Sequence, residues 1–237
     1  MTNRKLLLVL GMHRSGTSAV TGMLADLGVD LGPARVKQNA FNLRGNREIL
    51  RLRRLNERIL ERAGGSWCEP PDAVEITEDD RAERDAVLTE FTGEVIAVKE
   101  PRTLLAMELW RGLEPSRIGV IRNPVAVRES LGRRAAEGMG PVLPPARWEA
   151  LWRHYNRALL TEAERARLPV IDFDRAEELA AQARAALEAC GVTPHGDPTF
   201  FDAALVSGAG ESWRADADAE SIELWERLQR VAAPGPA

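Results

Sequence analysis

GMHRSGTS, residues Gly11–Ser18, is the stretch of sequence that decides the fold. It follows the short aliphatic run Lys5–Leu10 and opens an apolar stripe with helical spacing over Ser15–Leu27. A glycine-bearing turn between a buried strand and a helix leaves backbone N–H groups at the helix N-terminus, where they form an anion-binding site. The small and hydroxyl residues, together with one arginine, favour this interpretation over a generic glycine turn.

The loop is close to the Walker A pattern, G-x-x-x-x-G-K-[ST], but one position differs in its chemistry. Gly11 and Gly16 have the spacing of the two glycines, and Ser18 fits the last position. Thr17 stands in place of the lysine that contacts the β- and γ-phosphates, so we expect a shorter anion of lower charge. The guanidinium of Arg14 can bind such an anion through two hydrogen bonds. The predicted binding residues of the loop are His13, Arg14, Ser15, Gly16, Thr17 and Ser18.

The rest of the chain alternates between strand and helix patterns. Further aliphatic runs without strict alternation, typical of strands buried on both faces, are Glu94–Lys99, Arg117–Arg122 and Leu168–Phe173. The helix patterns are Glu48–Leu60, a segment from the Thr77 and Asp80 capping box toward Phe91, a segment from Pro124, Trp148–Ala166, and Ala176–Ala189 with Gly191 as its cap. This alternation predicts an α/β fold with a parallel sheet flanked by helices, of the P-loop nucleotide-binding type. We expect a single domain over residues 1–237 with a frayed tail from about residue 232.

Composition restricts the function classes. The chain has 237 residues, 44% of them hydrophobic and 29% charged, which is ordinary for a globular protein. A net charge of −4 argues against binding nucleic acid with the whole surface. Cys68 and Cys190 form no CxxC pair, so a zinc site or redox dithiol is not indicated. Because the apolar run Leu6–Leu10 is too short for a signal peptide and no run approaches a membrane span, we expect a cytoplasmic protein without a membrane partner.

A second motif follows the third aliphatic run, in Arg122–Ser130. Arg122 ends the run and Ser130 lies eight residues later, within a helix that begins near Pro124. The arginine and the serine can therefore converge on one anion from two elements. Taken alone, the segment fits equally an arginine paired with a carboxylate and a serine that packs in the helix.

Together, the two motifs resemble those of the PAPS-dependent sulfotransferases, in particular their bacterial branch, over a stretch from Leu6 to about Asp174. In that family a loop like Arg14–Ser18 binds the 5′-phosphosulfate of 3′-phosphoadenosine 5′-phosphosulfate (PAPS). The resemblance implies that Arg122 and Ser130 bind the 3′-phosphate of this donor. It also implies transfer of a sulfuryl group to the hydroxyl or amine of a small acceptor, such as a natural product or a sugar, with no metal needed for the donor.

The catalytic base departs from the pattern of many animal and plant members. Those proteins carry a histidine two residues after the lysine that ends this strand, and here the lysine is Lys99 and Pro101 stands in the place of the histidine. The resemblance implies that Lys99 stabilises charge on the bridging oxygen or the sulfuryl group. The base must come from elsewhere.

Two carboxylates are candidates for the base. Glu48 closes the stretch Asn42–Glu48, which looks like the N-x-x-G-x-x-E of related bacterial sequences and is followed by a similar L-N-x-R stretch. Its alternative role is to stabilise the first turn of a helix through the helix dipole. Glu100 is the second candidate, and its alternative role is a salt bridge to Arg102 or Lys99.

Several aromatic residues leave their roles open. The tryptophans that either line an acceptor pocket or belong to the core are Trp67, Trp110, Trp148 and Trp152. Ser207–Arg214 resembles the glycine-rich loop near the C-terminus of the family, which makes Trp213 and Arg214 either donor contacts or parts of a surface loop. Two other functions compete with the sulfotransferase, namely a P-loop kinase that acts on a nucleotide or small molecule, and an inactive nucleotide-binding module.

Overall fold

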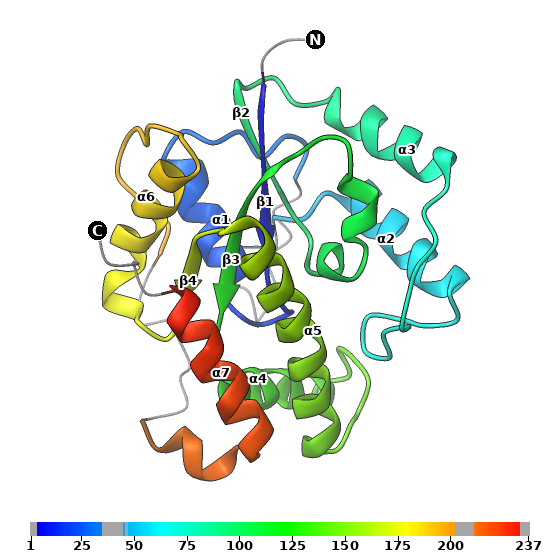
Figure 1. Ribbon diagram of the computed structural model, residues 1–237, viewed down its shortest axis with the longest axis vertical. Helices are drawn as coiled ribbons and strands as arrows, with labels where there is room; N and C mark the ends of the chain where they lie inside the picture. The colour runs from blue at the N-terminus through cyan, green and yellow to red at the C-terminus, as the bar shows by residue number, and fades with distance from the viewer. Residues whose placement is uncertain (1–3, 35–44, 46, 202–210, 233–237) are drawn as a thin grey trace.

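Four parallel strands form one sheet in the order β2-β1-β3-β4 (Figure 1). They are β1 (Lys5–Leu10), β2 (Val95–Lys99), β3 (Ser116–Ile121) and β4 (Val170–Asp172). The computed structural model describes residues 4–34, 45, 47–201 and 211–232. Strands were expected in these four places, and the α/β fold with a parallel sheet is confirmed. The strand β4 is shorter than predicted, although the flanking Pro169 and Phe173 still bond through their backbones to Gly119 and Ile121.

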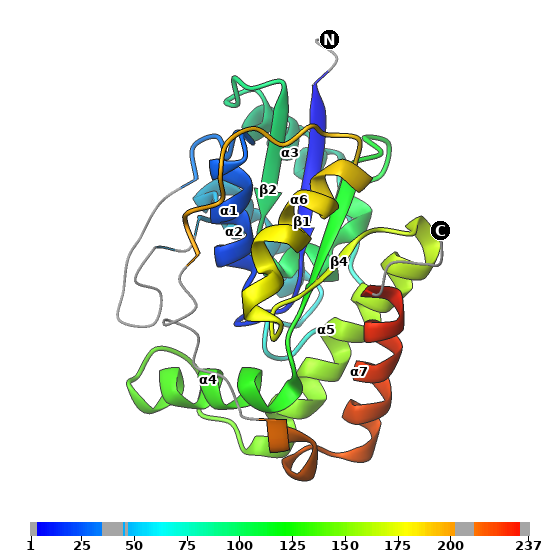
Figure 2. The same ribbon diagram turned by 90° about the vertical axis from the view of Figure 1, so that its left-hand side faces the viewer.

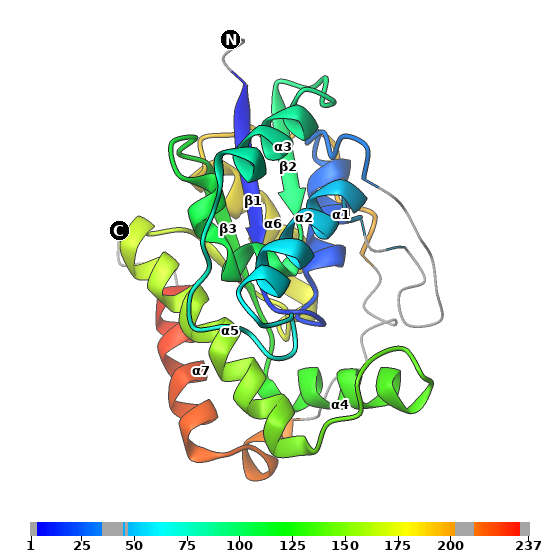
Figure 3. The ribbon, with the colours of Figure 1, turned by 90° about the vertical axis from the view of Figure 1, so that its right-hand side faces the viewer.

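Helices cover both faces of the sheet. Side chains of β1 alternate between the two faces, so that Leu7 and Val9 join one apolar cluster, and Leu8 and Leu10 join the other. The first face is covered by α1 (Thr17–Asp26) and α6 (Leu179–Ala189), which lie in front in Figure 2. The second face is covered by α2 (Leu50–Arg62), α3 (Glu78–Leu88), α5 (Pro145–Ala166) and α7 (Ala219–Ala232). Figure 3 shows α2, α3 and α5 in front of the sheet.

Two helices begin at residues that the sequence predicted as helix starts. The Thr77 hydroxyl accepts a hydrogen bond from the Asp80 amide at 3.2 Å, and the Asp80 carboxylate accepts one from the Thr77 amide at 2.9 Å, which confirms the capping box of α3. Pro124 occupies the first turn of α4 (Pro124–Ala136), as predicted, and the side chain of Asn123 caps this helix. Both helix starts depend only on residues that are close together in the sequence, which is why the sequence predicts them.

Several helix boundaries and one helix differ from the prediction, and one of these boundaries concerns a candidate site residue. The helix expected from Glu48 begins at Leu50, so Glu48 lies before the helix and not in its first turn. No helix was predicted after Ala189, yet α7 packs on α5 through a buried stripe. That stripe consists of Ser221, Leu224, Trp225 and Leu228, whose spacing of three and four residues is the signal that was missed. Ala232 belongs to α7 and is not part of a frayed tail, and residues 233–237 lie outside the described residues.

The topology places the site at one edge of the sheet. The chain crosses from β2, on one side of β1, to β3 on the other, and ligands of such sheets bind at this crossing, beyond the carboxyl ends of the strands. All four strands are parallel, so their carboxyl ends meet at one edge, and α4 lies beyond that edge in Figure 1. Among the helices of the described residues, none combines the length and the apolar composition needed to cross a bilayer.

Candidate functional site

The loop between β1 and α1 has the backbone form of an anion-binding turn. Arg14 and Gly16 adopt left-handed conformations, with φ angles of 69° and 90°. Gly16 is the N-cap of α1 and makes no side-chain cap, so the first-turn amides have no capping side chain. The Ser15 hydroxyl is fully buried and has no hydrogen-bond partner among the described residues. A buried donor without a partner carries a free-energy penalty that an incoming anion would remove.

The two glycines of the loop are required for different reasons. A Cβ atom at Gly16 would lie 2.1 Å from Cδ2 of Phe173, which follows β4, and the left-handed backbone disfavours any side chain there. A Cβ atom at Gly11 would lie 2.7 Å from the Val120 carbonyl oxygen and 2.8 Å from Cγ2 of Thr17. The methyl group of Thr17 therefore packs over Gly11.

The two sequence motifs meet in the structure. Arg14 Nε donates a hydrogen bond to Ser130 Oγ at 2.8 Å, and Arg122 Nη1 donates to the Arg14 carbonyl oxygen at 3.3 Å. All of these groups except Arg14 are nearly fully buried. The alternative role of Arg122, pairing with a carboxylate, is present as a long ion pair, because its Nε lies 3.9 Å from Asp174 Oδ1. Arg122 also lies over the Phe173 ring, 5.3 Å from the ring centre.

Cations crowd this part of the site. Burial, followed by the charges of Arg134, Arg122 and Arg133, lowers the pKa of Arg14 to about 10. Arg133 and Arg134 were not predicted, although they lie three and four residues after Ser130 and therefore near it on α4. Four guanidinium groups in mutual repulsion are most stable when an anion of high charge lies among them.

A second polar group lies beside the loop, at the end of β2. Lys99 is almost fully buried, and its Nζ donates to Ser18 Oγ at 3.2 Å and to Glu48 Oε1 at 2.9 Å. The structure thus brings together the loop, the predicted charge-stabilising lysine and the first candidate base. The Glu48 side chain keeps 16% of its surface exposed, so it is within reach of a molecule in solvent. The sequence match that led to Glu48 lies partly outside the described residues, at 42–44 and 46.

Glu100, the other candidate base, lies in a closed network. Its carboxylate accepts from Asn56 Nδ2 at 2.6 Å and from the Arg102 amide at 3.1 Å, and it pairs with the Arg102 guanidinium. Burial raises the pKa of Glu100 to about 7, against the lowering effect of Arg102, and the nearby Glu48 raises it further. The salt bridge to Arg102 that the sequence analysis left open is therefore present.

His13 lies against aromatic rings. Its ring centre lies 4.7 Å from that of Trp67 and 6.1 Å from that of Tyr155. Burial, followed by the charge of Arg102 and other cations, holds the pKa of His13 well below its usual value. The imidazole is therefore neutral at pH 7 and adds no further positive charge to the loop.

The other tryptophans divide between core and surface. Trp110, Trp148 and Trp152 are buried in the core, and only Trp67 of this group is partly exposed. Among the residues near the C-terminus, Trp213 packs on Trp225, with ring centres 5.8 Å apart, and Arg214 pairs with Glu226 at 3.1 Å. Both contacts tie this segment to α7, and the glycine-rich part before it, 207–210, lies outside the described residues.

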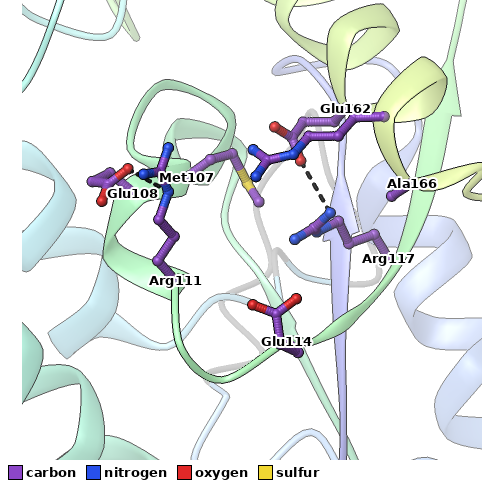
Figure 4. Close-up of a pocket in the computed structure, with 8 residues that line it drawn as sticks. Met107, Glu108, Arg111, Glu114, Arg117, Glu162 and Ala166 are labelled. Carbon is purple, nitrogen blue, oxygen red and sulfur yellow. Dashed lines mark ion pairs between the residues drawn. The ribbon is translucent and has the colours of Figure 1, made fainter.

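A separate cavity of about 230 Å³ lies at the opposite edge of the sheet, near the start of β3 (Figure 4). Four of its charged side chains form two pairs, with Arg117 3.3 Å from Glu162 and Arg111 2.7 Å from Glu108. None of the predicted site residues lines it.

Neither cysteine is bonded to another, since Cys68 and Cys190 are both free thiols. Within the part of the chain that the structure describes, no three His, Cys, Asp or Glu side chains are grouped so that they could hold a metal ion. Donor binding without a metal stays a prediction.

Comparison with solved structures places this arrangement among known folds. A sulfotransferase from Alicyclobacillus acidocaldarius superposes with a TM-score of 0.58, over 97% of this chain and 96% of that chain, at 13% sequence identity. The chain has a sulfotransferase-like fold. No protein-family model matches the sequence, and no curated protein matches it either. At this identity the likeness concerns the fold, and the activity has to be argued from the site.

The packing of Gly16 predicts the effect of one methyl group. Gly16→Ala should lower the free energy of unfolding by about 2 kcal/mol or more, because the new Cβ atom meets the Phe173 ring in a left-handed backbone. The matched control is Gly132→Ala in α4, where a Cβ atom meets nothing within 4 Å and should be neutral or stabilising. Urea unfolding of both variants measures the difference, and equal stability of the two would contradict the packing argument.

Proposed function

We propose that this protein is a PAPS-dependent sulfotransferase that transfers a sulfuryl group to the hydroxyl or amine of a small acceptor. The observation that carries the proposal is the contact of the two motifs, in which Arg14 bonds to Ser130 and Arg122 bonds to the Arg14 carbonyl. These contacts join the two segments into one proposed anion site. A simple glycine turn would not account for them. The sulfotransferase-like fold supports the same conclusion.

The donor carries negative charge at two ends, and the site has cationic and hydroxyl groups to match both. In the proposed complex the amides of the loop, the Ser15 hydroxyl and Lys99 hold the 5′-phosphosulfate. Arg122 and Ser130 hold the 3′-phosphate, with Arg14 between the two ends. The unpartnered Ser15 hydroxyl and the crowding around Arg14 are both relieved by such a ligand.

The reaction needs charge stabilisation and a proton acceptor. As the acceptor oxygen or nitrogen bonds to sulfur, the bond from sulfur to the bridging oxygen breaks, and negative charge grows on the departing bisphosphate. Lys99 lies beside Ser18 of the loop, where its ammonium can stabilise this charge. Glu48 accepts the proton that the acceptor loses.

Glu48 suits the role of base better than Glu100 does. Glu100 is 1% exposed, and its oxygens are occupied by Asn56 and Arg102. An acceptor could reach it only if that network opened. Glu48 is partly exposed and accepts a hydrogen bond from Lys99, which also lies next to the loop.

The first expectation concerns the nucleotide. 3′-Phosphoadenosine 5′-phosphate should bind much more tightly than AMP, because losing a charge-assisted contact costs roughly 1.5–3 kcal/mol, or about 10- to 150-fold in affinity. Arg122→Ala should remove most of this preference. Arg117→Ala is the matched control, since Arg117 lies near the start of β3, at the end opposite to Arg122, and pairs with Glu162. Calorimetry measures both, and equal affinity for the two nucleotides in the wild-type protein would refute the proposed 3′-phosphate site.

The second expectation concerns metal ions. Transfer from PAPS to a generic phenol should continue in the presence of a chelator, because a sulfuryl group carries less charge than a phosphoryl group and needs less cationic support. Thr17 in place of the Walker lysine points the same way. Turnover that is lost in chelator and restored by magnesium, with ATP as the better donor, would favour the kinase instead.

The third expectation concerns the base. Glu48→Gln should lower turnover by about 100-fold or more, since general-base catalysis contributes 10²–10⁴, while donor affinity stays within a few-fold. Glutamine keeps the shape but cannot accept the proton. If Glu100→Gln abolished turnover and Glu48→Gln did not, the base would be Glu100.

A further inference from the structure

The polar contacts between α2 and the end of β2 have no part in the chemistry proposed above. The apolar side of α2, with Leu52, Leu55 and Ile59, packs into the core of the second face. Apolar packing of this kind holds a helix against a sheet but is not directional. The contacts that can set the rotation and the height of α2 are therefore its hydrogen bonds.

Two such links join α2 to the segment that follows β2. Asn56 Nδ2 donates to Glu100 Oε2 at 2.6 Å and approaches Thr103 Oγ1 at 3.4 Å. One residue later on α2, Glu57 Oε1 accepts from Arg102 Nη2 at 3.1 Å. Both links reach the same short segment, which starts at the residue after Lys99.

These groups are buried, so breaking their hydrogen bonds costs free energy. Asn56 and Glu100 are each 1% exposed, and Arg102 is 6% exposed. A buried polar or charged group is stable only when its hydrogen bonds are made, so a shift of α2 that broke the Asn56 bond would leave the Glu100 carboxylate short of a donor. Small rotations or translations of α2 are therefore opposed.

The position of Glu48 depends on the position of α2, because the two are joined directly along the chain. It lies just before α2, two helical turns ahead of Asn56. Its carboxylate meets Lys99, the last residue of β2, and Glu100 directly follows Lys99 in the chain. Two adjacent residues at the end of β2 thus hold α2 and its leading segment at two points, Lys99 at Glu48 and Glu100 at Asn56.

We propose that Asn56 and Glu100 are positioning residues, whose buried hydrogen bond fixes α2 so that the Glu48 carboxylate lies against Lys99. This proposal rests on the proposed function for its catalytic consequence. Its structural part, the dependence of the Glu48–Lys99 contact on Asn56, stands apart from any reaction.

The structural part is tested by nuclear magnetic resonance, which needs no activity. The chain contains only three lysines, Lys5, Lys37 and Lys99, so the Lys99 Cε signal of protein with labelled lysine is assigned from a Lys99→Arg variant. Asn56→Ala changes no charge, yet it should move the Lys99 signal toward its position in Glu48→Gln. Asn156→Ala is the matched control, because Asn156 is equally buried but donates within its own helix, to the Trp152 carbonyl.

The catalytic part is tested by a double-mutant cycle on transfer from PAPS to a generic phenol. Asn56→Ala should lower kcat by about 10- to 100-fold with little change in the KM for the donor, as expected when a reacting group is misplaced. In the Glu48→Gln background the same change should matter by less than about 2-fold, because the group it positions is already lost. Asn56→Ser serves in the same cycle if the alanine variant does not fold.

The possible results separate the two proposals. A Lys99 signal that stays at its wild-type position in Asn56→Ala, or loss factors that multiply in the double variant, overturns the positioning role. A wild-type protein without transfer activity overturns the proposed function, while a Lys99 signal that moves in Asn56→Ala still supports the structural link.

Discussion

The hydrogen bond from Arg14 to Ser130 joins two segments 116 residues apart and brings the parts of the site together. It draws the loop after β1 against α4, which begins only after β3. Arg122 completes the joint by donating to the Arg14 carbonyl. The left-handed backbone at Arg14 turns that residue so that its side chain and its carbonyl are both used. Glycine at position 16 is required by the same turn, because Phe173 fills the space where a side chain would be.

Charge is distributed unevenly around this joint. On the α4 side, cations repel one another and lower the pKa of Arg14, so this side is suited to bind an anion. On the β2 side, each cation has a carboxylate, with Lys99 against Glu48 and Arg102 against Glu100. On the α4 side Arg122 and Arg133 also have carboxylates, Asp174 and Glu129, but each lies 3.9 Å away. The Lys99–Glu48 pair on the β2 side is closer, at 2.9 Å. The proposed function uses this difference, with the donor bound on the α4 side and proton transfer on the β2 side.

Aromatic residues pack behind the loop between β1 and α1. Tyr155 donates a hydrogen bond to the Trp67 carbonyl at 3.0 Å, which holds the loop Gly64–Asp72 close to His13. His13 is neutral in these surroundings, since burial and nearby cations lower its pKa. The loop between β1 and α1 thus lies against aromatic side chains, and its histidine adds no positive charge to it.

Local patterns in the sequence were sufficient for the parallel α/β fold, the glycine-bearing turn between β1 and α1, the capping box at Thr77 and the proline start of α4. Each of these depends on a few neighbouring residues, and the signal for each is contained in them. The contact of Arg14 with Ser130, the pairing of Lys99 with Glu48 and the enclosure of Glu100 were decided by tertiary structure. They join residues on different elements, and their geometry follows from strand order and helix packing. The sequence favoured Glu48 over Glu100 but left both open, and the tertiary structure adds the difference in burial, because the Glu48 side chain reaches solvent while Glu100 is enclosed by Asn56 and Arg102.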